Sequence, residues 1–288
     1  MSFFIENNHI EMNPYKADCN NCFGLCCVAL PFMESADFAF TKDAGTPCHH
    51  LQTDFRCGIH QRLRETGFRG CTVYECFGAG QKVSQHTYKG IDWRNNPLSA
   101  NEMFQILPII QQLHEMLYYL AEALQLGDTR PIRKELEDAL NETERLTLLE
   151  PQAVLAIDVS AHRAIINPLL LKTSELVRNS VAQQVSGRQK HTIKRNVKSN
   201  MMGAKLKNAD LRGMNLRGVF LIAADLRGAD MRHTDLIGAD LRDADLSSAD
   251  LTGAIFLTQA QVNSAMGDSK TKLPPALDAP RHWLKSEY

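Results

Sequence analysis

The sequence predicts a multidomain α+β protein in which three different regions follow one another along 288 residues. All eight cysteines lie between residues 19 and 76, helical periodicity covers the middle of the chain, and a five-residue pattern repeats towards the C-terminus. A hydrophobic content of 44% over this length favours packed modules over a disordered chain. We therefore expect a cysteine-rich module at 1–95, an α-helical region at 96–185, a basic linker at 186–202, a solenoid at 203–257 and a C-terminal cap at 258–288.

The eight cysteines are the candidate metal ligands: Cys19, Cys22, Cys26, Cys27, Cys48, Cys57, Cys71 and Cys76. No basic segment followed by a long apolar run opens the sequence, so a secretory signal is not expected. No run of about twenty apolar residues is present to span a membrane. We therefore expect a cytoplasmic protein, in which clustered cysteines bind metal more often than they form disulfides.

The order of these cysteines resembles the zinc- or iron-chelating CxxCxxCC domain family. The resemblance rests on residues 19–27 (CNNCFGLCC), 47–51 (PCHHL), 56–60 (RCGIH) and 70–76 (GCTVYEC). The spacing between the second and third cysteines is one residue longer than in the family's pattern. The resemblance implies either zinc or an iron–sulfur cluster as the cofactor and does not choose between them.

Both zinc and an iron–sulfur cluster accept four thiolates, so eight cysteines allow two sites. Adjacent Cys26 and Cys27 would point to opposite sides of an extended segment, so either two sites exist or one of these thiols is spare. We expect a first site built from Cys19, Cys22, Cys26 or Cys27, closed by some of Cys48, Cys57, Cys71 and Cys76. The second-choice ligands are His49, His50 and His60.

The central region predicts three helices. The first is expected to begin at a capping box, Ser99-Ala100-Asn101-Glu102, and to end at Gly127. A second should follow Pro131 to about residue 149, and a third should run from about residue 160 to 185, kinked or split at Pro168. The histidines of this region, His114 and His162, are expected to be packed or surface side chains and not catalytic groups.

The C-terminal region repeats every five residues. From Ala204 to Phe256 a large apolar residue recurs at eleven consecutive repeat positions, and a small or apolar residue stands two positions before each. Both can face inward only if the backbone turns a corner once per repeat, so that four repeats close a square coil. The segment therefore predicts a short solenoid of about three coils.

These repeats resemble the pentapeptide-repeat family, A-(D/N)-L-x-x, for example in residues 209–211, 239–241 and 249–251. The resemblance implies a right-handed quadrilateral β-helix. Its open end would expose unpaired strand edges, so a cap is needed. We expect a short helix from Gln259 to Ala265 and an apolar plug from Trp283 to supply it.

The outward positions of the solenoid carry nearly balanced aspartates and basic residues, which disfavours the strongly negative surface that DNA mimicry requires. Three outward positions are apolar instead: Phe220, Ile222 and Ile237. We expect them to form a docking patch for the rest of the chain, for a protein partner or for a second copy.

Motifs of phosphate binding, serine hydrolysis and zinc proteolysis are absent from the sequence, so catalytic residues stay unknown and an enzyme is not favoured. With a net charge of −1 and no aromatic residues in the basic linker, nucleic-acid binding is also disfavoured. We expect a metal-binding scaffold or sensor that engages a protein partner through the β-helix. The alternatives are an iron–sulfur-dependent redox or group-transfer enzyme and a resistance or immunity protein that protects a topoisomerase.

Overall fold

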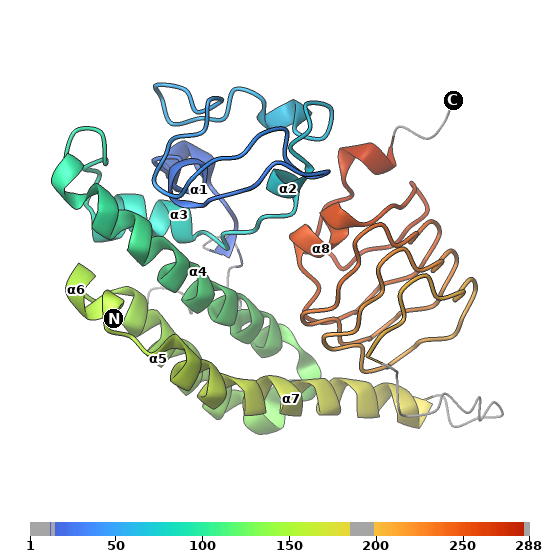
Figure 1. Cartoon of the computed structure of the whole chain (residues 1–288). Coiled ribbons are helices and arrows are strands. Elements are labelled where there is room, and N and C mark those ends of the chain that lie inside the picture. The colour runs from blue at the N-terminus through green and yellow to red at the C-terminus, as the bar shows by residue number, and fades with distance from the viewer. Residues whose placement is uncertain (1–11, 13–14, 185–198, 285–288) are drawn as a thin grey trace. The chain divides into compact units, whose positions relative to one another are not determined.

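The computed structural model describes residue 12 and residues 15–184 and 199–284 (Figure 1). The chain divides into two compact units, one made of Met1–Leu126 and Ile132–Leu170, the other of Gly127–Pro131 and Leu171–Tyr288. The cysteine-rich segment and the first long helices thus belong to the same unit. The predicted basic linker falls mostly on residues outside the described ranges.

The cysteine-rich segment is built from short helical turns: η2 (Cys19–Asn21), α1 (Leu25–Ala29), η3 (His60–Arg62), α2 (Arg69–Thr72), α3 (Ala79–Gln81) and the π-helical turn η4 (Lys82–Thr87). Leu25 and Val28 of α1 are buried, and α1 packs against the first long helix, α4 (Pro97–Gln125). The loops close through isolated antiparallel bridges, one of which joins Phe32 to Lys42. Phe32 also stacks on Phe38 with ring centroids 4.5 Å apart, which gives this segment a small aromatic core.

The helical region contains α4, η5 (Gly127–Ile132), α5 (Arg133–Thr147), α6 (Pro151–Leu155) and α7 (Val159–Gln184). The predicted capping box is wrong, because α4 begins at Pro97 and Ser99 lies inside its first turn. Proline favours the first helical position, where its missing N–H is not needed. Pro168 does not split α7, which continues through it. His114 and His162 are packed, as expected, with 5% and 8% of their surface exposed.

The repeats wind into coils of 20 residues, because parallel bridges join each position to the one four repeats later, as in Asp210–Asp230 and Asp230–Asp250 (Figure 1). This is the four-repeat coil that the sequence predicts. The leucines face inward: Leu226 and Leu246, one coil apart, are both fully buried. The predicted right hand of the coil stays a prediction.

Each repeat turns a corner at one position. All eleven residues at every fifth position from Gly203 to Gly253 have a positive φ, and six of them are glycine. Because a corner follows every few residues, residues 199–284 pair through isolated bridges and not through continuous strands. The first bridge joins Asn200 to Phe220, so the coil already includes the end of the predicted linker.

The predicted cap is present at the C-terminal end of the coil. Helix α8 (Gln259–Ser264) begins with a capping box formed by Thr258 and Gln261. The Gln261 amide also donates to the carbonyl oxygens of Leu236 and Ala239, at 2.8 Å each. Trp283, in η6 (Arg281–Trp283), is 2% exposed and packs in the core of the coil. The last coil is thereby closed to water.

Candidate metal centre

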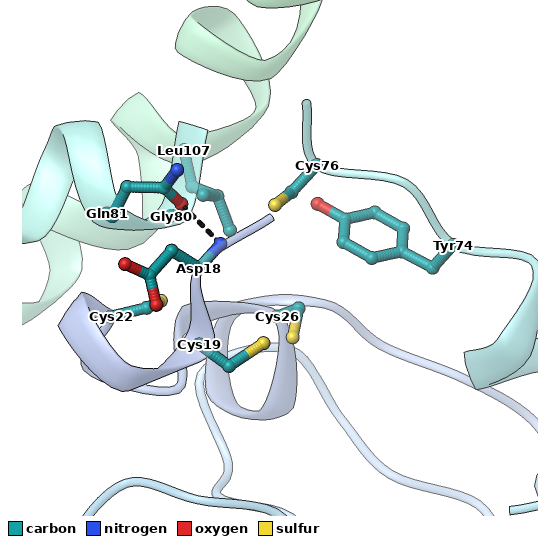
Figure 2. Close-up of a pocket in the computed structure, with 9 residues that line it drawn as sticks. All are labelled: Asp18, Cys19, Cys22, Cys26, Tyr74, Cys76, Gly80, Gln81 and Leu107. Atoms are coloured by element: carbon teal, nitrogen blue, oxygen red, sulfur yellow. Dashed lines mark hydrogen bonds between the residues drawn. The ribbon is translucent and has the colours of Figure 1, made fainter. Parts of the chain in front are cut away.

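Four thiols line one small cavity of about 30 Å³: Cys19, Cys22, Cys26 and Cys76 (Figure 2). They come from three separate segments, namely the η2 turn, helix α1 and the loop before α3. Figure 2 shows the sulfur atoms of Cys19 and Cys26 pointing towards one another and the Tyr74 hydroxyl pointing towards Cys76. All eight cysteines of the chain are free thiols. The fold therefore gathers side chains that lie 57 residues apart in sequence.

Helix α3 and the η4 turn hold the Cys19–Cys22 segment in place. The Gln81 side chain accepts a hydrogen bond from the Asp18 N–H at 3.1 Å and donates to the Lys16 carbonyl at 2.8 Å. The Ser84 hydroxyl accepts the Phe23 N–H at 3.0 Å. These bonds span more than 60 residues of sequence and fix the first two cysteines against the segment that follows Cys76.

Helix α4 positions Cys76 through hydrogen bonds to the residues immediately before and after it. The Gln111 amide donates to the Glu75 carbonyl at 3.0 Å, and Nδ1 of His114 bonds the Phe77 carbonyl at 2.8 Å. Burial lowers the pKa of His114 to about 4, so its imidazole is neutral at pH 7 and Nδ1 carries the proton that it donates. The two residues that flank Cys76 are thus anchored to a rigid helix.

Backbone amides point at two of the sulfurs. The Cys22 thiol accepts bonds from the Leu25 and Gly24 N–H groups, and the Cys76 thiol accepts them from Gly80 and Gly78. Burial raises the pKa of Cys19 to about 12 and that of Cys76 to about 11, so the thiols are protonated at neutral pH when no cation is bound. A bound cation reverses this preference, because it stabilises the thiolates that the amides already favour.

Gly80 is required for this packing. A Cβ atom at position 80 would lie 2.7 Å from the sulfur of Cys22, closer than side-chain atoms approach one another. The sequence contains the corresponding signal in Gly78-Ala79-Gly80, two residues after Cys76. Beside Cys76, this glycine pattern supplies backbone amides to one sulfur and leaves room for a second thiol.

The structure corrects one premise of the predicted ligand set, the extended geometry of the Cys26–Cys27 pair, and the ligand set of eight cysteines stays a prediction. Cys26 and Cys27 lie in helix α1 and not in an extended segment, so their side chains diverge by about 100° and not by a half-turn. Of the pair, only Cys26 lines the cavity, and of the four downstream cysteines only Cys76 does. Cys48, Cys57 and Cys71 lie elsewhere. Over residues 15–184 and 199–284, no three His, Cys, Asp or Glu side chains are already arranged as a complete metal-ligand group.

The second-choice histidines are not part of the cavity. His49 stacks on Phe40 with ring centroids 4.7 Å apart, and His50 packs edge-on against Phe68 at 5.1 Å. His60 begins the η3 turn. Thiols therefore provide the donor atoms of the candidate centre.

On the solenoid, four aspartates are paired with the arginine two residues later: Asp210, Asp225, Asp230 and Asp240. Asp225 bonds Arg227 at 2.7 Å, and Asp230 bonds Arg232 at 2.6 Å. The hydrogen-bonded guanidinium of Arg227 lowers the pKa of Asp225 to about 2. Phe220 is 48% exposed, whereas Ile222 and Ile237 are partly buried. The charges are thus neutralised locally, and the predicted apolar patch keeps one clearly exposed ring.

The five-residue repeat and its 20-residue coil define a pentapeptide-repeat protein. The family model for pentapeptide repeats matches in eight copies, over residues 197–221 and 221–256. The chain is 60% identical over 278 residues to "Uncharacterized protein YybG" of Bacillus subtilis (strain 168), and the match covers 96% of this chain and 97% of that protein. The chain therefore belongs to the same family as YybG, and its residues 197–256 carry pentapeptide repeats.

Two solved pentapeptide repeat proteins are also similar to parts of the chain. The first is from the Arabidopsis thaliana thylakoid lumen, with 26% identity, a TM-score of 0.20 and coverage of 28% of this chain and 60% of that one. The second is from Nostoc Pcc 7120, with 37% identity, a TM-score of 0.13 and coverage of 28% and 78%. The likeness of residues 19–76 to the CxxCxxCC domain stays a prediction. None of the helices in the described ranges is both long and apolar enough to cross a membrane.

Proposed function

We propose that this protein is a metal-binding pentapeptide-repeat scaffold, in which Cys19, Cys22, Cys26 and Cys76 hold one Zn²⁺ ion and the solenoid engages a protein partner. The observation that carries the metal proposal is the convergence of four thiols from three segments on one cavity. Four thiolates with no open position are the ligand set of a structural zinc site. Eight free thiols are typical of a protein in a reducing compartment such as the cytoplasm.

The cavity of about 30 Å³ between the four thiols is the proposed seat of a single ion. The amides directed at Cys22 and Cys76 would stabilise their thiolates after the ion binds. The ion would supply folding free energy to a segment whose helices have at most six residues each before α4.

Metal analysis of the purified full chain, combined with its absorption spectrum, tests this proposal. We expect a colourless protein that contains zinc, and we expect Cys19→Ser and Cys76→Ser to bind at least one ion less than the wild type. A brown protein that contains iron and sulfide and absorbs light at about 400 nm would instead support the iron–sulfur alternative. A chain that binds neither metal would refute the proposed centre.

The solenoid is the proposed partner-binding element. Phe220 and Met202 are 48% and 55% exposed, and Ile222 lies one coil after Met202 on the same side. Exposed apolar side chains gathered on one side mark interaction surfaces. The paired aspartates argue against protection of a topoisomerase by DNA mimicry, since opposite charges at about 2.7 Å cancel within a Debye length.

A further inference from the structure

The two ends of the coil differ in how they are covered. At the C-terminal end, α8 and Trp283 close the core. Among the described residues no earlier coil pairs with the first coil (residues 200–219), where Leu206, Ala209 and Met214 are only partly buried. We infer that this N-terminal edge binds an extended acidic segment of a partner protein as an added strand. The inference rests on the proposed function, because it names the kind of partner that the solenoid engages.

The first coil presents unpaired backbone groups along this edge. The Leu206 N–H donates to the Asp225 carbonyl at 2.8 Å, and the Asp225 N–H donates to the Ala204 carbonyl at 2.9 Å. Because backbone groups alternate in direction along a strand, the N–H and carbonyl of Lys205 point away from the second coil, and over the described ranges neither has a hydrogen-bond partner. The same is true of Asn215, two repeats later. Unpaired edges of this kind accept a further strand.

Charge is graded along the coil axis, although many of the aspartates pair with arginines. The first coil carries four basic residues and one acidic residue, whereas the third coil (residues 240–259) carries one basic and four acidic residues. The N-terminal edge is therefore positive while the coil as a whole is nearly balanced. A partner segment of opposite charge would be attracted to this edge and oriented on it.

Two lysines at the edge have no ion pair. Lys205 and Lys207 are exposed, and in the described part of the chain neither side chain bonds a carboxylate. The arginines of the same coil, by contrast, bond aspartates at 2.7 and 3.2 Å. Lys207 lies within electrostatic range of Asp225, but that carboxylate already bonds Arg227 at 2.7 Å. Both lysines are therefore available to a partner.

The spacing of these lysines defines the side chains that the added strand needs. Side chains alternate across a strand, so residues paired with Lys205 and Lys207 face outward, and the residue between them faces the core at Leu206. The coils stack like positions in this manner, because Asp225 is bridged to both Lys205 and Asp245. An acidic, an apolar and a second acidic residue in succession would thus pair both lysines and cover the open end of the core.

Other occupants fit this edge less well. A second copy of the chain would place two positive edges against each other, which like-charge repulsion opposes. The preceding segment, residues 185–198, has five basic residues and no acidic one, so its charge has the same sign. A nucleic acid has the opposite charge but lacks the amides and carbonyls with which a β-edge pairs. An acidic protein segment offers both.

Peptide binding to the full chain, measured by fluorescence anisotropy, tests the inference. The probe is a labelled peptide in which acidic and apolar residues alternate. We expect saturable binding that is at least about fivefold weaker in the double variant Lys205→Ser and Lys207→Ser, because two exposed ion pairs are lost. The matched control, Lys270→Ser with Lys272→Ser, removes two lysines of the same spacing near the capped end and should bind as the wild type does. Circular dichroism checks that each variant is folded.

A peptide with N-methylated backbone amides separates strand pairing from charge. Methylation removes the donors that an added strand needs and leaves every carboxylate in place, so we expect this peptide not to bind. A third peptide, of the same composition with its acidic residues in one block, should bind more weakly than the alternating one. Equal binding of all three peptides, or of a single-stranded oligonucleotide, would show a surface that attracts any negative charge and would overturn the inference.

The variant Phe220→Ser separates this inference from the proposed function. Binding that is retained in Phe220→Ser and weakened in the lysine variant supports the edge. Binding that is lost in Phe220→Ser and unchanged in the lysine variant would overturn the edge and leave the exposed apolar side as the partner site. No binding of the alternating peptide to the wild type would overturn the inference alone, because the apolar side could still engage a partner of another kind. Metal content of the same samples reports separately on the metal part of the proposed function.

Discussion

Individual thiols around the cavity are held by contacts that the chain makes at long range. Cys76 is fixed because its neighbours bond Gln111 and His114 of α4, and Cys22 is fixed because Gly80 leaves room for its sulfur. Ion binding would stabilise these contacts together with the thiols, because metal binding and folding of the segment form one equilibrium. Small substitutions around the cavity should therefore change the affinity for the metal ion without unfolding the whole chain.

The substitution Gly80→Ala tests whether the position of the Cys22 sulfur matters for metal binding. Its Cβ would displace the Cys22 sulfur, so we expect zinc affinity to fall by about 10- to 100-fold in competition with a chromophoric chelator. Gly127→Ala is the matched control, because a Cβ there has no atom within 4 Å. Equal affinities of the two variants would show that Cys22 does not bind the ion.

His114 makes the stability of the cysteine-rich unit depend on pH. Its folded pKa of about 4 lies below the ordinary value of 6.5, so the unfolded chain binds the proton first as the pH falls. The stabilisation is complete above pH 6.5 and is lost towards pH 4, with a magnitude on the order of 3 kcal/mol. Urea unfolding followed by helical circular dichroism should show a smaller loss in His114→Gln than in the wild type in the same metal state. Parallel pH curves for the two proteins would contradict this assignment.

Among the structural elements, the coil follows most directly from the sequence. Corner residues with positive φ recur at every fifth position, and between corners the inward residues are alternately large and small. Leu226 and Leu246 are fully buried one coil apart, as the repeat predicts, whereas Arg227 projects outward and pairs with Asp225. The inner and outer positions should therefore respond very differently to substitution.

We expect Leu226→Asp to destabilise the coil by several kcal/mol, because it places an unpaired charge in the apolar core. Arg227→Ser, at the adjacent outward position, should be nearly neutral, since exposed ion pairs contribute little. Thermal unfolding of the two variants provides the comparison. Equal shifts of their melting temperatures would mean that the inward register is wrong.

The short elements could not be predicted in the same way. Helix α1 has five residues, too few to show a helical period, so the Cys26–Cys27 pair was expected in an extended segment. Of the four downstream cysteines only Cys76 lines the cavity, and its position there depends on contacts with α4, which no local pattern encodes. The start of α4 was misplaced because a capping-box motif at Ser99 competes with a proline two residues earlier.

For the whole molecule, the apolar patch on the coil predicts an association. Replacing Phe220, Ile222 and Ile237 together by serine should separate the modules of the chain from one another or dissociate a dimer, because the patch would no longer gain about 25 cal/mol per Å² on burial. Small-angle scattering measures the particle, with Arg227→Ser as a control on a charged side. The same compact particle of the same mass in all three proteins would leave the patch without a docking role.

The central claim is that metal holds the cysteine-rich segment together while the coil is stable without it, since structural metal binding and folding are one equilibrium. Hydrogen exchange measured by mass spectrometry, before and after a chelator removes all metal from the full chain, tests it most directly. The account predicts that amides of residues 19–81 exchange much faster after chelation and that those of residues 204–256 are unchanged. Unchanged protection of residues 19–81 after complete metal removal would contradict it.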